Sequence, residues 1–355
     1  MTTKKIAVRF EKVSKIFDKD VVAVDNVSFS IEAGSLVTLL GPSGCGKTTI
    51  LRMVAGLEFP SKGKIFIENE DVSLLPATKR DVSMVFQSYA LFPHMNVAQN
   101  VAYGLKASSV PKDEIDSRTE EVLKLVGLTG FDKRLPSELS GGQQQRVAVS
   151  RALVLKPQVL LFDEPLSNLD AKLRRQVREE IRDIQQQLHL SVIYVTHDQE
   201  EALAVSDRVI VMRNASIAQS GTPFELYETP NDVFVADFIG DANLLDINIL
   251  SIKGDLAEIS LGNNKKLTLP HKGLVQNKIK LAVRPESIFL LDQDKDAYLQ
   301  GTVAKISYLG SHLEYLINTK LGQLFVKDKN VLRPFSAGSD VWIGLAKHGV
   351  SLVSL

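Results

Sequence analysis

Cysteine, net charge and long apolar runs are all scarce in this chain of 355 residues. The single cysteine, Cys45, excludes an intramolecular disulfide, which rules out a disulfide-stapled secreted domain and favours a reducing compartment. Lysine plus arginine and aspartate plus glutamate both total 42, so the formal charge is zero. Proteins that bind nucleic acids or anionic membranes normally carry a basic excess. We therefore expect no nucleic-acid partner.

No window approaches the roughly 20 consecutive apolar residues that a membrane span needs. Residues 1–17 include basic side chains, but no apolar stretch of signal-peptide length follows them. We therefore expect any contact with a membrane to be made through another protein. The six histidines are scattered and Cys45 is unpaired, so the sequence indicates no transition-metal site.

Strand and helix signals alternate through the first two-thirds of the chain. Four short apolar runs are typical of buried strands: 35–40, 158–162, 191–196 and 208–212. Continuous apolar runs separated by helices indicate a parallel sheet that is covered on both faces. Between about residues 89 and 156 the strand signals vanish and helical patterns dominate, which predicts a helical insertion in an α/β core.

The pattern changes from about residue 241. Short alternating segments separated by turn residues follow, and such spacing predicts a small antiparallel barrel or sandwich. Residues 231–240 have the pattern of a helix that leads into it. The sequence therefore predicts an α/β domain at 1–240, with its helical subdomain at about 89–156, and an all-β domain at 241–355.

A glycine-rich loop follows the first of these apolar strands. Residues 41–48 fit the pattern G-x-x-x-x-G-K-[S/T] between a strand and a helix, which is the context of a nucleotide phosphate loop. Its backbone N–H groups and the helix N-terminus attract phosphates. Lys47 would reach the β- and γ-phosphates, and the Thr48 hydroxyl would ligate Mg²⁺. The predicted nucleotide contacts are Gly41, Pro42, Ser43, Gly44, Cys45, Gly46, Lys47, Thr48 and Thr49.

Two interpretations of Cys45 stay open. A small side chain fits this position in the loop, and that suffices to explain the residue. Alternatively, Cys45 is a reactive thiol, because a helix N-terminus lowers the pKa of a nearby thiol.

Polar residues follow two of the other buried strands. Asp163 and Glu164 come after the run 159–162, at the strand end where ligands bind in open parallel sheets. Asp163 is suited to holding Mg²⁺, and Glu164 is suited to activating the attacking water as a general base. A polar strand end without chemistry is the alternative, but the phosphate loop favours catalysis. His197 follows the strand 191–196 in the same way, and a contact with the γ-phosphate is weighed against a structural histidine.

The segment LSGGQQQ, residues 139–145, is the most discriminating stretch. Ser140 is a natural helix N-cap, and two glycines allow close approach to the helix N-terminus. With the phosphate loop and the acidic pair, this segment resembles the ABC-type ATPase family of P-loop NTPases over about residues 6–240. In that family it is the signature motif, which implies that Ser140, Gly141, Gly142 and Gln143 contact ATP held by another subunit.

The resemblance assigns further residues. Gln87 matches the glutamine loop that reaches the metal and the attacking water, Asp170 lies in the D-loop (167–170), and His197 matches the switch histidine. Phe17, placed ahead of the first sheet strand, matches the aromatic that stacks on adenine, with core packing as the alternative. The implied cofactors are ATP and Mg²⁺. The implied catalytic residues are Glu164, His197, Lys47 and Gln87, and the implied metal ligands are Thr48, Gln87 and Asp163.

One phosphate loop and one signature occur in each chain. The family geometry takes the two from different subunits, which implies that two copies sandwich two ATP molecules head to tail. The partner is a second copy of this chain or a close paralogue.

The last third, including GDANLL (240–245) and VRPESIFL (283–290), resembles importer ATPases with a C-terminal TOBE (OB-like) domain that serves dimer contact or regulation. Their solutes include ferric iron, sugar phosphates, sulfate, polyamines and maltose. The closest overall likeness is to ferric-iron import ATP-binding proteins, and hexose phosphates, polyamines or another small solute stay open. Residues 86–95 resemble the surface that receives a coupling helix, with core packing of Tyr89, Leu91 and Phe92 as the alternative.

The resemblance implies an ATPase at the cytoplasmic face of the bacterial inner membrane. Its partners would be integral-membrane permease subunits and, indirectly, an extracytoplasmic solute-binding protein. A soluble ABC ATPase that acts on nucleic acid or ribosomes is the alternative from another class. A third interpretation makes the C-terminal domain a sensor of a regulator or small ligand.

Overall fold

The computed structural model describes residues 5–261, 265–271, 273, 279–294 and 297–355. The chain divides into two compact units, Met1–Pro223 and Phe224–Leu355. The second unit begins before residue 241, where the sequence pattern changes, because the helical residues Ala236 and Val233 pack with Ala282 and Val353 of that unit. Within the described residues, no helix has both the length and the apolar character needed to cross a membrane.

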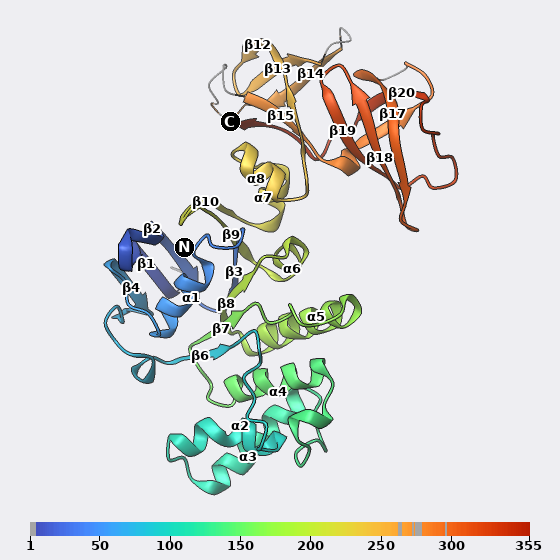
Figure 1. The fold of residues 1–355 in the computed structure, drawn as a ribbon. Coiled ribbons are helices and arrows are strands. Elements are labelled where there is room, and N and C mark those ends of the chain that lie inside the picture. The colour runs from blue at the N-terminus through green and yellow to red at the C-terminus, as the bar shows by residue number, and fades with distance from the viewer. Residues whose placement is uncertain (1–4, 262–264, 272, 274–278, 295–296) are drawn as a thin grey trace. The chain divides into compact units, whose positions relative to one another are not determined.

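A six-stranded sheet forms the middle of the first unit (Figure 1), with the strand order β10-β9-β3-β8-β7-β6. Its strands are β3 (Leu36–Leu40), β6 (Val82–Val85), β7 (Val159–Asp163), β8 (Ser191–Thr196), β9 (Arg208–Arg213) and β10 (Ser216–Gly221). All neighbours pair in parallel except β10, which runs antiparallel to β9 at one edge. The four buried strands predicted from the sequence are confirmed. The residues that follow β3, β7 and β8 therefore meet at one edge of the sheet.

The side chains of the central strands alternate between two hydrophobic cores. In β7, Leu160 and Phe162 belong to the core that includes residues of α2 and α4, whereas Val159 and Leu161 belong to the core that includes α1 and the N-terminal strands. Both faces of the sheet are thus covered. This explains why its strands read as continuous apolar runs rather than as alternating ones.

Within the described part of the first unit, six α-helices accompany this sheet. α1 (Lys47–Ala55), α5 (Ala171–Leu188) and α6 (Gln199–Val205) follow β3, β7 and β8 respectively. α2 (Val97–Ala107), α3 (Lys112–Leu125) and α4 (Gly141–Leu153) cluster beyond β6 (Figure 1). All three lie within residues 89–156, where the sequence predicts helices. Asn96 and Ser140 begin α2 and α4 with capping boxes, which fix these helix starts.

An antiparallel sheet near the N-terminus was not predicted. It has the order β2-β1-β4-β5 and consists of β1 (Ile6–Phe17), β2 (Val21–Glu32), β4 (Lys62–Ile67) and β5 (Glu70–Asp71). The prediction that Phe17 precedes the first strand is therefore wrong, because Phe17 is the last residue of β1. Register shifts between Phe10 and Lys15 interrupt the two-residue alternation that would have revealed these strands.

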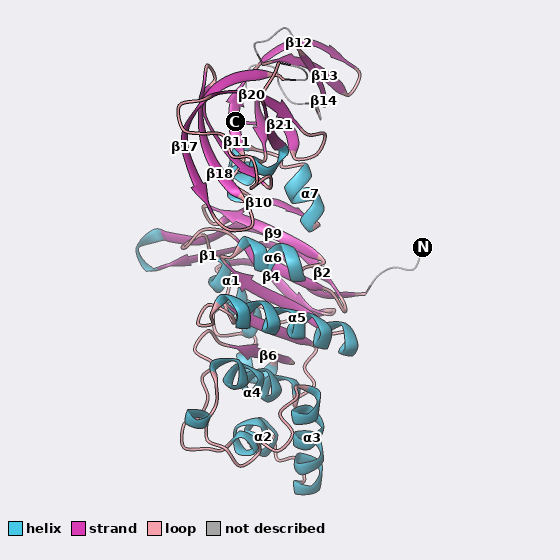
Figure 2. Ribbon diagram, turned by 90° about the vertical axis from the view of Figure 1, so that its right-hand side faces the viewer, coloured by secondary structure: helices cyan, strands magenta, loops and turns pink. Residues whose placement is uncertain are grey.

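The second unit is rich in strands, which Figure 2 shows in magenta. The helices α7 (Pro223–Glu228) and α8 (Val233–Phe238) precede three antiparallel sheets, with the orders β11-β15-β21, β12-β13-β14 and β16-β20-β17-β18-β19. The strands are β11 (Asn243–Asp246), β12 (Asn248–Lys253), β13 (Leu256–Ser260), β14 (Lys266–Pro270), β15 (Ile279–Val283), β16 (Ile288–Leu291), β17 (Leu299–Tyr308), β18 (Leu313–Thr319), β19 (Gly322–Asp328), β20 (Asp340–Leu345) and β21 (Val350–Ser354). The predicted all-β character of this region is confirmed.

Arg284 anchors the two short helices of the second unit. Its guanidinium is buried, and it donates to the carbonyl oxygens of Tyr227 (Nη2, 2.6 Å), Ala236 (Nη1, 2.6 Å) and Ile239. Burial lowers the pKa of Arg284 to about 10, so the group stays charged at neutral pH. These bonds reach the C-terminal ends of α7 and α8, where helices leave backbone carbonyl groups without intrahelical partners.

Candidate functional site

The glycine-rich loop between β3 and α1 lies tightly against neighbouring backbone. Gly44 and Gly46 have φ values of 79° and 103°, which are left-handed conformations that favour glycine. A Cβ atom at Gly46 would lie 2.3 Å from the carbonyl oxygen of Ala23, and one at Gly41 would lie 2.4 Å from that of Met212. Close approach of backbone therefore requires glycine at both positions.

Lys47 is the first residue of α1 and is 5% exposed. Its Nζ atom donates to the carbonyl oxygens of Gly41 at 2.7 Å and Pro42 at 2.9 Å, so the ammonium lies inside the loop. Thr48 and Thr49 follow it in the first turn of the helix. The N-terminus of α1 and this ammonium together form a positively polarised site, which suits phosphate groups.

Asp163 and Glu164 lie where β7 ends. Thr48 Oγ1 donates to Asp163 Oδ1 at 3.3 Å, which joins the phosphate loop to the acidic pair. Burial raises the pKa of Asp163, and the neighbouring charge of Glu164 adds to that rise. Glu164 has a φ of 45°, a conformation that is costly for a residue with a side chain and that is concentrated at functional sites.

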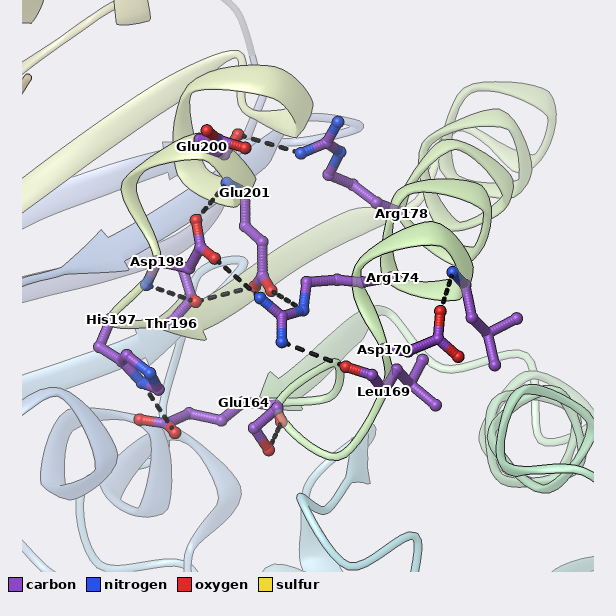
Figure 3. Close-up of polar contacts among 12 residues, drawn as sticks. Glu164, Leu169, Asp170, Arg174, Arg178, Thr196, His197, Asp198, Glu200 and Glu201 are labelled. Atoms are coloured by element: carbon purple, nitrogen blue, oxygen red, sulfur yellow. Dashed lines mark hydrogen bonds and ion pairs between the residues drawn. The ribbon is translucent and has the colours of Figure 1, made fainter. Parts of the chain in front are cut away.

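His197 meets Glu164 at the adjacent strand end. β7 and β8 pair in parallel, and the backbone N–H of Glu164 donates to the carbonyl oxygen of Val195 at 3.0 Å. The side chains lie close as a result, with His197 Nδ1 and Glu164 Oε2 3.1 Å apart (Figure 3). The structure thus brings together the acidic pair, the histidine and the phosphate loop.

Gln87 lies beyond β6 and contacts the D-loop. Its Nε2 atom donates to Ser167 Oγ at 3.1 Å, and Asn168 Nδ2 donates to the Gln87 carbonyl oxygen at 3.0 Å. Ser167 Oγ in turn donates to the carbonyl oxygen of Glu164 at 3.1 Å. A chain of hydrogen bonds therefore connects Gln87 to the residue that is predicted to be the general base.

The signature segment begins α4. Ser140 is exposed, its hydroxyl accepts from the N–H of Gln143, and the Gln143 side chain accepts from the N–H of Ser140. A Cβ atom at Gly142 would lie 2.8 Å from Leu173 Cδ1, so glycine allows α4 to pack against α5. Asp170 caps α5 by accepting from the N–H of Leu173 and is itself exposed.

The structure bears on three alternatives from the sequence. Phe17 is 39% exposed, with Lys15 Nζ 4.7 Å from its ring centroid, so it does not pack in the core. Tyr89 is buried in the core that includes α2, and Leu91 packs against it. Cys45 is buried, with its Sγ 3.8 Å from Lys47 Nζ.

Two side chains near the strand ends were missed in the sequence. Arg174 on α5 forms an ion pair with Asp198, the residue after His197. The sequence held a weak signal for Arg174, because this residue stands four positions after the helix cap Asp170. It therefore lies on the same side of the helix start as that cap.

These features define a class. In this parallel sheet a phosphate loop follows β3 and an acidic pair lies at the end of β7, while the signature segment begins α4. This arrangement is the nucleotide-binding unit of an ABC-type ATPase. A family model described as "ABC transporter" matches residues 24–167, and a TOBE domain model matches residues 281–353.

Relatives extend the likeness over the whole chain. The Fe(3+) ions import ATP-binding protein FbpC of Rhizobium etli is 54% identical over 354 residues, which cover 100% of this chain and 99% of that protein. The protein of the same name from Agrobacterium fabrum is 52% identical, covering 99% of each chain, and that from Photorhabdus laumondii is 46% identical, covering 98% and 97%. The chain belongs to the ATP-binding subunits of ABC transporters. It binds ATP and is an ATPase that energises transport.

The solved structures also include a similar protein. CbiO1 from Clostridium perfringens, part of the ABC transporter complex cbiONQ, matches with a TM-score of 0.60 and 28% identity, covering 63% of this chain and 91% of that chain. The resemblance to the ABC importer group, which the sequence motifs indicated, is confirmed by these relatives.

Proposed function

We propose that this chain hydrolyses ATP to drive the uptake of ferric ions through an ABC importer. The observation that carries the proposal is its identity of 46–54% over nearly the whole chain to relatives named for ferric-ion import. Hexose phosphates and polyamines are the alternative solutes that the sequence resemblance leaves open. The chain would reach any of them through membrane subunits.

The strand-end oxygens would hold Mg²⁺. Asp163 Oδ1 and Thr48 Oγ1 are 3.3 Å apart. Gln87, whose Nε2 atom donates to Ser167 of the D-loop, would add an amide oxygen. Carboxylate, hydroxyl and amide oxygens are the ligands that Mg²⁺ prefers. A cation here would also favour the ionised form of Asp163, whose pKa burial raises. When bound, Mg²⁺ would neutralise part of the negative charge of the phosphates.

The remaining groups of the site have complementary roles. Glu164 would take a proton from the attacking water as general base, and His197, 3.1 Å away, would hold that carboxylate and contact the γ-phosphate. Lys47 and the N–H groups of residues 41–48 would stabilise the charge on the transferring phosphoryl group. Phe17, exposed at the end of β1, would stack on adenine.

A second copy would complete each site. Ser140 and Asp170 are exposed at the starts of α4 and α5, where they are accessible to another chain. In a two-fold symmetric dimer the same surface acts twice, so residues 140–143 of each copy would contact the ATP held by Lys47 of the other. Closure of this dimer would then drive the transport step.

The membrane subunits would bind near residues 86–95. Phe86 and Tyr103 are large exposed side chains in this region, and Phe92 packs against Tyr103 with ring centroids 4.6 Å apart. Exposed aromatic side chains of this kind suit an apolar helix of a permease. The chain would then lie at the cytoplasmic face of the membrane, and the solute-binding protein would act from the other side.

Uptake assays test the proposal in cells that lack the chromosomal copy of this chain. Radiolabelled ferric citrate, glucose 6-phosphate and spermidine are supplied separately to cells that express the wild type, Glu164→Gln or no protein. We expect only ferric uptake to depend on the chain, and we expect Glu164→Gln to fail to restore it. Dependence of sugar-phosphate or polyamine uptake instead would contradict the ferric assignment.

A further inference from the structure

Arg174 joins the two loops that carry the proposed catalytic pair. It lies on the first turn of α5, directly after the D-loop (Figure 3). Its Nη2 atom donates to the carbonyl oxygen of Leu169 at 3.1 Å, and its Nη1 atom donates to Asp198 Oδ2 at 3.3 Å. One guanidinium therefore contacts the loop after Glu164 and the residue after His197 at the same time.

Asp198 is held in place by further hydrogen bonds. Asp198 Oδ1 accepts from the N–H of Glu201 as the cap of α6, and the N–H of Asp198 donates to Thr196 Oγ1 at 3.0 Å. Thr196 Oγ1 donates to Glu201 Oε2 at 2.8 Å, and Tyr194 OH donates to the same oxygen at 3.2 Å. A shift of Asp198 would therefore disturb several hydrogen bonds on both sides of His197.

Glu201 explains why the residue at position 174 carries a positive charge. Its side chain is 4% exposed, and Arg174 Nε lies 3.8 Å from its Oε1 atom. Burial raises the pKa of Glu201, and the Arg174 charge opposes that rise. Charge neutralisation alone, however, would be met by a lysine, whereas two directed bonds to separate loops need the planar fork of an arginine.

A neighbouring residue of α5 also packs closely against another helix. Leu173, the residue before Arg174, packs against Gly142 of the signature segment. The helix start can therefore hold Arg174 in a defined place. Glu164, His197 and Arg174 also line one cavity of about 150 Å³, so a change in Arg174 acts next to the reacting groups.

We infer that Arg174 is a positioning residue, which keeps Glu164 and His197 in register by tying the D-loop to the turn after β8. This inference rests on the proposed roles of that pair. Misplacement of a catalytic group by about 1 Å is enough to slow an enzyme on the order of a hundredfold. We expect Arg174→Gln to lower kcat on the order of tenfold and to leave the KM for ATP within about twofold, because Arg174 does not belong to the phosphate loop.

Steady-state ATPase assays on the full-length chain, with melting temperatures, test the inference. Arg175→Gln is the matched control, because Arg175 is exposed on the same helix and pairs with Glu179. Arg174→Lys keeps the charge beside Glu201, so we expect it to restore the melting temperature but not kcat. Recovery of kcat as well would show that only charge matters, and a kcat for Arg174→Gln equal to that of the control would overturn the inference.

A double-mutant cycle gives an independent readout. Asp198→Asn keeps a helix-capping side chain but removes the charge that Arg174 contacts. If Arg174 and Asp198 act through one contact, the kcat of the double variant equals that of Arg174→Gln. Losses of kcat that add up in the double variant would contradict the inference. Glu164→Gln is measured beside them. If Glu164→Gln still turns over ATP, Glu164 is not the general base. If Glu164→Gln is inactive but Arg174→Gln has the wild-type kcat, only the positioning role of Arg174 is rejected.

Discussion

A buried cation in each unit of the molecule is bound to backbone carbonyl groups, but with opposite consequences. Lys47 in the first unit donates to Gly41 and Pro42, which belong to its own loop. Arg284 in the second unit donates to Tyr227, Ala236 and Ile239, which lie at least 45 residues away in sequence. The first set of contacts shapes a local site, and the second holds separate segments together.

The surroundings of the two cations differ as well. Lys47 lies close to strand ends that carry Asp163, Glu164 and His197, whose contacts join several loops at one edge of the sheet. Arg284 lies in the segment VRPESIFL, but its bonds end on carbonyl groups in or directly after α7 and α8. A buried charge near converging side chains indicates chemistry, whereas one surrounded by distant carbonyl groups indicates architecture.

The largest effects, on ATPase activity and on stability, are expected when the two cations are removed in two separate variants. Lys47→Ala should lower kcat/KM for ATP by at least about a hundredfold, because the charge on the phosphates loses a partner. Its free energy of unfolding should fall by about 1 kcal/mol, because the buried Gly41 carbonyl loses its donor whereas Pro42 is exposed to water.

Arg284→Met should behave in the opposite way. Several buried carbonyl groups lose their donor, so the free energy of unfolding should fall by about 3 kcal/mol. ATPase activity per folded molecule should stay near the wild-type value. Denaturant unfolding and ATPase assays on both variants check the contrast, and an inactive but fully stable Arg284→Met protein would break it.

A smaller effect is expected at Asp163. Since burial raises its folded-state pKa, the folded protein binds more protons than the unfolded chain between the ordinary aspartate pKa and the raised value. Stability in the absence of nucleotide should therefore be greatest below that window and should decrease as the pH rises through it. Asp163→Asn should abolish this decrease and raise the melting temperature at neutral pH by a few degrees.

The same variant should lose Mg²⁺-dependent hydrolysis by at least about tenfold. Melting curves over pH, without nucleotide or metal, and ATPase assays over Mg²⁺ concentration measure the two effects. A melting temperature that depends on pH as in the wild type would show that the Asp163 charge is not the cause.

The smallest effect is expected at Cys45. The thiol is buried, so a maleimide should label the folded chain far more slowly than the denatured chain. Cys45→Ser should change kcat by less than about twofold, because a side chain of similar size fills the same place. Rapid labelling of the folded protein with complete loss of ATPase activity, prevented by prior ATP, would instead support the reactive-thiol interpretation.

Much of the site could be predicted because local motifs coincide with topology. Lys47, Asp163, Glu164 and His197 each follow an apolar strand, and a parallel sheet collects such positions at one edge. The helical region and the strand-rich second unit were also evident from their periodicity.

Other features depend on contacts that periodicity does not report. Register shifts in β1 hid the N-terminal sheet and with it the place of Phe17. The contact of Arg174 with Asp198 joins residues 24 positions apart and forms only where α5 meets the turn after β8. The carbonyl partners of Arg284 were likewise outside any local pattern, because they are defined by the packing of α7 and α8.

The central claim is that each ATP site is built from the phosphate loop of one copy and the signature of another. Mixing two inactive variants, Lys47→Ala and Ser140→Arg, tests it directly in an ATPase assay. In a mixed dimer one site has an intact Lys47 facing an intact Ser140, so random pairing should restore up to about a quarter of wild-type activity. If the mixture stays as inactive as either variant alone, while analytical ultracentrifugation shows that the two chains pair in the presence of ATP, the claim is contradicted.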